Sequence, residues 1–203
     1  MINLGQRLDR AFFARASEVV APDLLGCLLV APGEGLTAGI VEVEAYDQAD
    51  PASHSHRGPT PSNQVMFGPA GHLYTYFTYG MHWCANVVTG PTGHGQAVLL
   101  RAAEPVTGHE TFHRRRRGAS PRDLLRGPAR LAQAFGLDGG VNGLDLVADD
   151  APLRLHAKDE ADTAPEVVTG PRVGVRLAAD VPRRYSIAGS RLVSTYKRHA
   201  KAL

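Results

Sequence analysis

Hydrophobic and polar positions alternate most regularly along residues 39–46 of this chain. A period of two residues predicts a β-strand whose successive side chains point to opposite faces of a sheet. One face carries apolar side chains that we expect to join a core, namely Val41, Val43 and Ala45. The other face carries two carboxylates and a phenol, namely Glu42, Glu44 and Tyr46. Such a face is typical of a solvated edge strand, or of a strand end where water is held and activated.

Further short apolar and aromatic runs predict more strands, each bounded by glycine, proline or polar turn residues. These runs are residues 27–30, 72–79, 80–88, 97–103, 153–155, 167–177 and 185–196. The turn-forming residues 32–35 join the first run to residues 39–46 and predict a hairpin. Tyr79-Gly80 predicts the turn of a second hairpin.

Helical signals are short and scattered along the chain. The predicted helices are residues 11–14, 18–20, 22–25, 104–117 and 128–134. We expect Ser17 to cap the second of them, and Pro128 and Gly136 to bound the last. Because no strand–helix–strand rhythm recurs, the fold class predicted is α+β, with a mixed or antiparallel sheet in a single domain over residues 1–203.

Composition narrows the class of protein. At 203 residues and 43% hydrophobic composition, the chain is able to bury a sizeable core. No apolar run approaches the roughly 18–20 residues of a membrane-spanning helix, and the N-terminus lacks the plan of a signal peptide. Cys27 and Cys84 lie in apolar runs, which predicts reduced core residues in an intracellular protein.

A net charge of +2 conceals a segregation of charge along the chain. Residues 101–130 carry eight basic and three acidic side chains, and residues 171–203 carry eight basic and one acidic. Residues 131–170 between them carry two basic and eight acidic side chains. The two basic blocks predict either one surface for a polyanion or an Arg-rich solvated surface balanced by the acidic block.

Aromatic side chains gather in residues 74–83, which hold three tyrosines, a phenylalanine and the single tryptophan. Such a run is typical of a sheet face packed on a helix, or of a surface on which bases stack. Arg101 lies within an apolar strand, so we expect it to be buried with a carboxylate partner. The long polar loop of residues 47–71, which carries His54 and His56, suggests a functional loop.

Several motifs occur in a fixed order along the chain. They are residues 41–46 (VEVEAY), 52–55 (ASHS), 60–63 (TPSN), 66–67 (MF), 73–81 (LYTYFTYGM), 84–86 (CAN), 99–102 (LLRA), 104–105 (EP), 127–131 and 172–175 (RVGV). Together they are similar to the alkyladenine (3-methyladenine) DNA glycosylase family of the mammalian type. The resemblance covers most of the chain and is weakest at the ends and in the acidic block. It implies a compact domain with a curved, mainly antiparallel sheet flanked by helices and long loops.

The resemblance also implies the catalytic groups. Glu44 would be the general base that activates water, and Arg101 and the main-chain carbonyl of Val173 would help to hold that water. Such a carboxylate would both deprotonate water and stabilise an oxocarbenium-like sugar. The lysines, at positions 158, 197 and 201, lie outside the matched core. We therefore expect water rather than an amine as the nucleophile, an abasic site as the product, and no metal or other cofactor.

The remaining roles implied by the resemblance concern a base flipped out of duplex DNA. Tyr46 and Tyr76 would sandwich the base, with His54 along its edge, and Asn86 would discriminate against guanine. A hairpin carrying Tyr79 and Met81 would enter the minor groove, where Tyr79 would fill the gap left in the duplex. The expected partner is double-stranded DNA with alkylated or deaminated purines, and the expected protein is a monomer in a bacterial cytoplasm, associated with the nucleoid through DNA.

Two other functions remain open at this level. The tyrosines and arginine clusters are also compatible with a non-catalytic module that holds single-stranded or damaged nucleic acid. His54, His56 and Glu44 are compatible with a metal-dependent hydrolase, although their spacing matches no zinc signature.

Overall fold

The strand predicted at residues 39–46 is longer in the computed structural model, where β2 (Leu36–Tyr46) runs through the middle of the sheet. One edge of β2 pairs with β5 (Ala97–Thr107). Its other edge is shared, because its first residues pair with β1 (Leu28–Ala31) and residues 42–44 pair with β8 (Arg184–Ile187). The structure describes residues 4–158 and 164–203, so residues 159–163 of the acidic block lie outside the described part.

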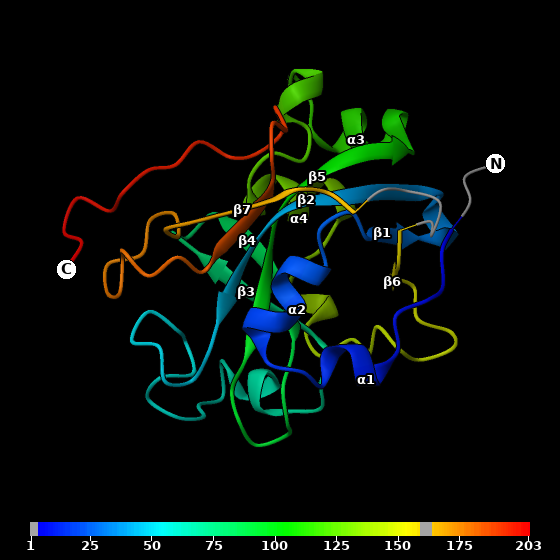
Figure 1. Cartoon of the computed structure of the whole chain (residues 1–203). Coiled ribbons are helices and arrows are strands. Elements are labelled where there is room, and N and C mark those ends of the chain that lie inside the picture. The colour runs from blue at the N-terminus through cyan, green and yellow to red at the C-terminus, as the bar shows by residue number, and fades with distance from the viewer. Residues whose placement is uncertain (1–3, 159–163) are drawn as a thin grey trace.

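Within that part of the chain, eight strands form one sheet in the order β3-β4-β5-β2-β1-β6, with β8 joining β2 and β7 joining β8. All of these pairs are antiparallel, and the sheet curls around its buried side (Figure 1). The remaining strands are β3 (Leu73–Thr78), β4 (His82–Val88), β6 (Arg154–His156) and β7 (Val167–Gly170). The predicted α+β class with a curved, mainly antiparallel sheet is confirmed.

The pairing of β2 with β5 is interrupted by β-bulges. The register shifts between Ile40 and Glu42 and again between Glu42 and Val43, so Val41 and Arg101 have no partner in register. Bulges bend a strand and re-aim side chains, and here they fall where Glu42 faces β5. Val41 is buried as predicted, although the cluster of core residues in the described chain contains Ile40 and Val43 and not Val41.

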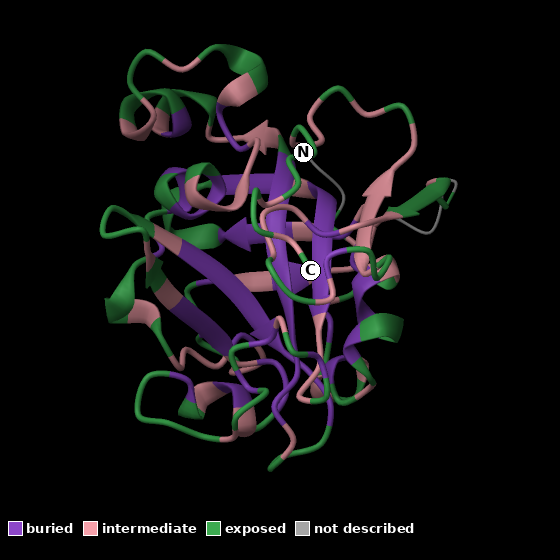
Figure 2. Cartoon of the chain, turned by 90° about the vertical axis from the view of Figure 1, so that its left-hand side faces the viewer, coloured by how far each residue is buried: buried purple, intermediate pink, exposed green. Residues whose placement is uncertain are grey.

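Two helices pack against the sheet. α2 (Ser17–Asp23) packs on β2 and β5, and α4 (Pro128–Phe135) packs on β4 and β5. Figure 2 shows the central strands as a buried layer, whereas β7 and β8 are half-buried or exposed. The predicted bounds of α4 are confirmed, since Pro128 begins it and Gly136 ends it with a φ of 71°, a left-handed conformation that glycine adopts without strain.

Two helix predictions near the N-terminus need correction. Ala16, not Ser17, is the N-cap of α2, and no side chain caps that end. Residues 22–25 form no separate helix, because the Leu24 N–H bonds to the Val20 carbonyl and the helix continues past Pro22. α1 (Arg10–Phe13) lies close to its predicted position.

The helix predicted from residue 104 is also wrong at its start. Glu104 and Pro105 belong to β5, opposite Gly39 and Ala38, and α3 (His109–Arg115) begins only after Gly108. The register is irregular next to Pro105, which is where a strand tolerates a residue that donates no hydrogen bond. Pairing along β2 thus overrides the local helical preference.

Short single-turn 3₁₀ helices complete the described elements, namely η1 (Pro32–Glu34), η2 (Gln64–Phe67), η3 (Pro121–Asp123) and η4 (Gly139–Val141). The two closing strands are shorter than predicted, since β7 ends at Gly170 and β8 ends at Ile187. The residues beyond each strand form irregular segments. Pro171 follows β7 directly and has no N–H for a further pair.

Burial of the sheet should dominate stability. Val87 in β4 is 0% exposed, whereas Val168 in β7 is 49% exposed. We expect Val87→Ala to lower the free energy of unfolding by about 2–3 kcal/mol, because it removes two buried methyl groups and leaves a cavity. Val168→Ala makes the same chemical change in an exposed strand and should lower it by less than about 0.5 kcal/mol. Urea denaturation of both variants measures the difference, and equal losses would contradict the assignment of the core.

Candidate active site

A cavity of about 400 Å³ opens beside the end of β2. Its walls come from β2, β3, β4 and β5 and from the irregular segment 173–177 that follows β7. The loop of residues 47–71 and the C-terminal segments lie on the same side of the molecule, to the left in Figure 1. Both polar and apolar side chains line the cavity, as in a typical binding site for a small planar group.

Arg101 sits between two buried carboxylates at the base of this cavity. Its Nε lies 3.1 Å from Glu42 Oε1, and its Nη1 lies 3.2 Å from Glu44 Oε2. Burial opposes the charge of Arg101, but the Glu44 and Glu42 carboxylates outweigh that effect and raise the pKa of the guanidinium. The prediction that Arg101 is buried with a carboxylate partner is confirmed, and the alternative of a solvated acidic face on β2 is excluded.

Glu44 has two further donors. The Tyr46 hydroxyl donates to its Oε2 at 2.8 Å, and the main-chain N–H of Val173 donates to its Oε1 at 2.7 Å. Burial, followed by the Glu44 carboxylate, raises the pKa of the Tyr46 phenol well above its ordinary value, so this hydroxyl remains a donor. Glu44 therefore lines the cavity with its orientation held from three sides. Val173 is brought to the site as expected, and its contact with Glu44 is made by its N–H.

Glu42 does not line the cavity and is bound from the opposite side. It accepts hydrogen bonds from the Ser194 N–H at 2.7 Å, the Ser194 hydroxyl at 2.8 Å and Arg184 at 3.2 Å. Ser194 Oγ also accepts from Arg101 Nη2 at 3.0 Å. The two glutamates, alike in the sequence, thus have different environments. Sequence reasoning missed Ser194, because nothing local signals a contact across 152 residues.

Aromatic rings form one wall of the cavity. The rings of His54 and Tyr76 meet edge to face with centroids 4.5 Å apart, and His54 Nδ1 lies 3.0 Å from the Tyr74 hydroxyl. Tyr76 is partly exposed, whereas Tyr74 is buried in a small cluster beside it. Tyr46 lines the cavity from β2. The structure therefore brings Tyr46, Tyr76 and His54 together, and it gives Tyr74 a packing role.

Asn86 is buried and reaches the same cavity from β4. Its Nδ2 donates to the Tyr74 carbonyl at 3.0 Å. This contact is the ordinary backbone partner that a polar strand residue needs, and it also fixes the amide orientation within the cavity.

The β3–β4 hairpin projects exposed side chains at the mouth of the cavity. Tyr79 is 79% exposed and Met81 is 67% exposed. Tyr79 and Gly80 have φ values of 52° and 66°, and the predicted turn at these residues is confirmed. A bulky residue at positive φ is unusual, and its ring is held out from the sheet. Tyr79 also lines the cavity, so the exposed tip of the hairpin lies next to the cavity that holds Glu44.

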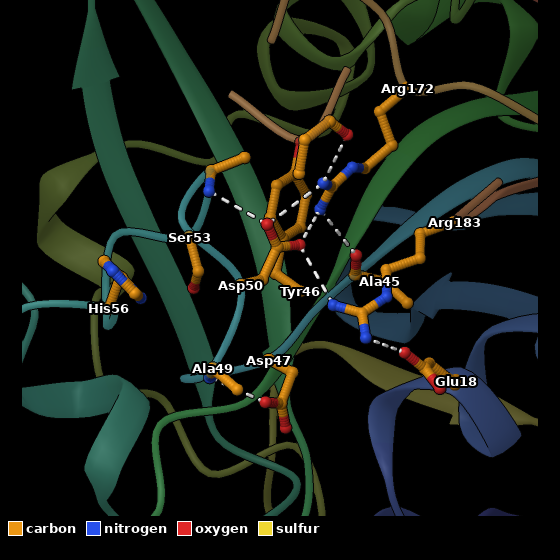
Figure 3. A network of polar contacts seen from close by, with 12 residues as sticks. Glu18, Ala45, Tyr46, Asp47, Ala49, Asp50, Ser53, His56, Arg172 and Arg183 are labelled. Carbon is orange, nitrogen blue, oxygen red and sulfur yellow. Dashed lines mark hydrogen bonds and ion pairs between the residues drawn. The ribbon is translucent and has the colours of Figure 1, made fainter. Parts of the chain in front are cut away.

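A buried ion pair that sequence reasoning missed lies behind Tyr46. Arg172 is 1% exposed and binds both carboxylate oxygens of Asp50, which is 3% exposed (Figure 3). The Arg172 guanidinium carbon lies 4.7 Å from the centroid of the Tyr46 ring. The pair ties the loop that carries His54 to the residue that precedes Val173. Arg172 falls in the motif at 172–175, yet the motif does not indicate its partner.

His56 is not brought together with His54 and Glu44. His54 lines the cavity, whereas His56 is exposed and its Nδ1 lies 3.2 Å from the Gln48 carbonyl. Over the described residues, no group of three or more His, Cys, Asp or Glu side chains is placed to hold a metal ion. The constellation required for the metal-dependent hydrolase therefore does not form around these three residues.

The two basic blocks meet in space. Arg122 Nε donates to the Arg191 carbonyl at 3.0 Å, and Arg126 donates to the Val193 carbonyl at 3.0 Å. Arg122 and Arg191 are exposed, and Ser194 in the same segment contacts Arg101 at the base of the cavity. The basic surface is therefore joined to the site, as expected for a protein that holds a polyanion.

Among the described residues, no helix is long and apolar enough to cross a membrane. The two cysteines are buried and unpaired, as predicted. Cys84 lines the cavity, where burial raises the pKa of its thiol and keeps it protonated.

An aromatic cavity with a buried carboxylate at its base, next to an exposed hairpin and a basic surface, is typical of an enzyme that acts on nucleic-acid bases. The family model described as "Methylpurine-DNA glycosylase (MPG)" matches residues 11–191, and the chain belongs to this family. It is thus a DNA glycosylase, a hydrolase of N-glycosyl bonds, and the alternative of a non-catalytic binding module is wrong. The resemblance inferred from the motifs is confirmed.

Similar proteins occur in bacteria and in an archaeon, and each is named "Putative 3-methyladenine DNA glycosylase". One from Rhodopseudomonas palustris is 50% identical over 191 residues, which cover 94% of this chain and 89% of the relative. One from Burkholderia lata is 50% identical over 196 residues, covering 94% and 92%. One from Methanoculleus marisnigri is 50% identical over 190 residues, covering 92% and 98%.

The environment of Glu42 predicts a large loss of stability on neutralisation. Glu42→Gln would leave Arg184 without its buried countercharge and Arg101 with Glu44 alone, and it should lower the free energy of unfolding by about 3–5 kcal/mol. Glu34→Gln makes the same change in an exposed pair with Arg115 and should lower it by less than about 1 kcal/mol. Thermal and urea unfolding measure both. A loss for Glu42→Gln no larger than that of the control would contradict a buried clamp.

Asp50 predicts a pH-dependent contribution to stability. Burial alone would raise the pKa of Asp50, but hydrogen bonds from Arg172 hold it below its ordinary value. A lowered pKa in the folded state stabilises the fold above the unfolded pKa of about 3.9, and this contribution is lost as the pH falls through the folded pKa. Asp50→Asn should therefore destabilise the protein at neutral pH and resemble the wild type more closely in acid.

Urea unfolding of wild type and Asp50→Asn from neutral pH into the acid range measures that difference. Asp180→Asn is the matched control, because Asp180 forms an exposed pair with Arg198 and its loss should change stability little. A gap between wild type and Asp50→Asn that stays constant into acid would show that the charge of Asp50 is not the source of its contribution.

Proposed function

We propose that this glycosylase flips alkylated or deaminated purines out of duplex DNA and removes them by hydrolysis, leaving an abasic site. The substrates we expect are 3-methyladenine, hypoxanthine and ethenoadenine. The observation that carries the proposal is Glu44, held by Arg101 and the Val173 N–H at the base of an aromatic cavity. The names of the relatives support 3-methyladenine, and the wider range rests on the family resemblance.

In the proposed reaction, a water molecule next to Glu44 attacks C1′ of the deoxyribose. Glu44 accepts the proton of that water, and the N-glycosyl bond breaks with its electron pair passing to the departing base. The carboxylate also stabilises the positive charge that develops on the sugar. A base that is already cationic, such as 3-methyladenine, leaves as a neutral molecule, whereas hypoxanthine requires a proton as it leaves. Arg101 and the Val173 N–H hold the Glu44 carboxylate in its orientation.

Binding of the flipped base would rely on the aromatic wall. Tyr46 and Tyr76 would stack on its two faces, His54 would lie along its edge, and Asn86 would reject the exocyclic amine of guanine. Each stacked face contributes about 1–3 kcal/mol, comparable with the few kcal/mol needed to unstack and unpair a base. All four of these side chains line the cavity in which the base would bind.

Binding of the duplex would rely on the hairpin and the basic surface. The exposed Tyr79 would enter the space that the base vacates, with Met81 beside it in the minor groove. The arginines of residues 101–130 and 171–203 would neutralise phosphates. We further propose that residues 1–203 act as one glycosylase domain, as a monomer, in a bacterial cytoplasm where DNA binding associates it with the nucleoid.

Water is the proposed nucleophile because the described lining of the cavity offers no side-chain amine. Of the described residues that line the cavity, none is a lysine. An amine nucleophile would form a covalent imine with the sugar. Borohydride should therefore trap no adduct between the protein and DNA during turnover.

Glu44→Gln provides the decisive test. In EDTA, the wild type should release a base from duplexes containing hypoxanthine or ethenoadenine and from alkylated DNA. Glu44→Gln should lose at least about 10³-fold in single-turnover rate, because proton acceptance and charge stabilisation are both removed. Binding of the lesion duplex should persist.

Glu34→Gln is the control, since it neutralises an exposed glutamate away from the cavity and should retain full activity. Base release that survives in Glu44→Gln would show that another group activates the water. Absence of release by the wild type from any duplex would contradict the proposed substrates.

A further inference from the structure

A row of alternating charges leads from the surface of α2 to the back of Tyr46. Glu18 on α2 pairs with Arg183, Arg183 Nη1 lies 3.1 Å from Asp50 Oδ2, and Asp50 pairs with Arg172. Figure 3 shows Asp50 lying between the two arginines, with Glu18 at the far end. The row begins half-exposed at Glu18, whose side chain is 46% exposed, and ends fully buried at Arg172.

Arg172 stands directly against the aromatic ring that faces the cavity. Its guanidinium carbon lies 4.7 Å from the Tyr46 centroid, and its Nη1 donates to the Ala45 carbonyl at 3.3 Å. Neither Arg172 nor Asp50 lines the cavity. Both residues are therefore placed to act on a bound base through Tyr46, without touching it.

The row is electrically balanced. Two arginines and two carboxylates alternate in it, so its net charge is zero. The neighbouring cluster at the base of the cavity, formed by Glu42, Glu44, Arg101 and Arg184, is balanced in the same way. A buried arginine does not lose its proton, so the charge of Arg172 persists whatever happens to its partner.

A base stacked on the open face of Tyr46 would lie about 8 Å from the Arg172 guanidinium, the 4.7 Å to the ring plus one stacking distance. At an effective dielectric constant of about 20, an uncompensated unit charge at that distance changes a binding or rate constant on the order of tenfold. Relative to the free protein and free DNA, an added positive charge disfavours the transition state of a base that binds as a cation, and it favours that of a neutral base, on which negative charge develops as it leaves.

We propose that Asp50 and Arg172 set the balance between cationic and neutral substrates, with Asp50 cancelling the positive charge that Arg172 places behind Tyr46. They are positioning residues for the stacking face of Tyr46. The inference rests on the proposed function, since it requires Tyr46 to stack on the flipped base.

The test compares two substrates within one preparation. Single-turnover release is measured at neutral pH, with the protein in excess over DNA but below saturation, from DNA with 3-methyladenine, which is cationic, and from a duplex with ethenoadenine, which is neutral. The quantity of interest is the ratio of the two rate constants. Because both rates come from the same sample, a smaller folded fraction cancels from the ratio.

Asp50→Asn leaves Arg172 uncompensated and should lower the ratio of cationic to neutral release about tenfold. Arg172→Met keeps apolar packing against Tyr46 but leaves Asp50 in excess, and it should raise the ratio by a similar factor. The double variant removes both charges and should return the ratio to within about twofold of the wild type.

Glu18→Gln is the matched control. This variant changes the net charge of the row by the same amount as Asp50→Asn, but the change lies at the exposed end of the row. Water screens the charge there, so the ratio of the two rate constants should stay unchanged. Thermal unfolding of each variant reports stability separately.

Opposite shifts in the two single variants, with recovery in the double variant, would establish the inference. Shifts of the same sign, or equal losses for both substrates, would overturn it and leave the pair with a structural role only. Failure of the wild type to release either base would instead refute the proposed function, so the two failures are distinguishable.

Discussion

Two carboxylates share one buried arginine at the bulge between β2 and β5, and the site depends on that contact. Arg101 remains charged in the interior because Glu42 and Glu44 compensate it, and each carboxylate also accepts a hydrogen bond from a main-chain N–H. Removing any one of these three side chains would leave a buried charge with less compensation. Alternation along β2 gives both carboxylates the same face, and the bulges interrupt the pairing with β5 at Arg101.

The two glutamates have different roles because different groups surround their carboxylates. Glu42 is enclosed by Ser194 and Arg184 and anchors the C-terminal segment against the sheet. Glu44 faces the cavity and is available for chemistry. The C-terminal segment thereby completes the site and carries part of the basic surface that we propose binds DNA phosphates.

Much of the architecture follows from local patterns in the sequence. Alternation identified the central strand, glycine and proline bounded α4, and the aromatic run with Tyr79-Gly80 marked the hairpin. The errors have different causes. β5 extends through Pro105 because pairing along β2 outweighs a local helical preference, whereas α2 continues past Pro22 through the hydrogen bond from the Leu24 N–H to the Val20 carbonyl.

The sequence by itself determined which residue types are present and in what order, and this was enough to identify the family and to nominate Glu44, Arg101 and the tyrosines. Only the tertiary structure decided their environments. It distinguished Glu42 from Glu44, supplied Ser194 from the other end of the chain, and placed Arg172 and Asp50 behind Tyr46. The reason is physical: burial and charge compensation are properties of groups brought together across more than a hundred residues, and no local pattern encodes which partner arrives.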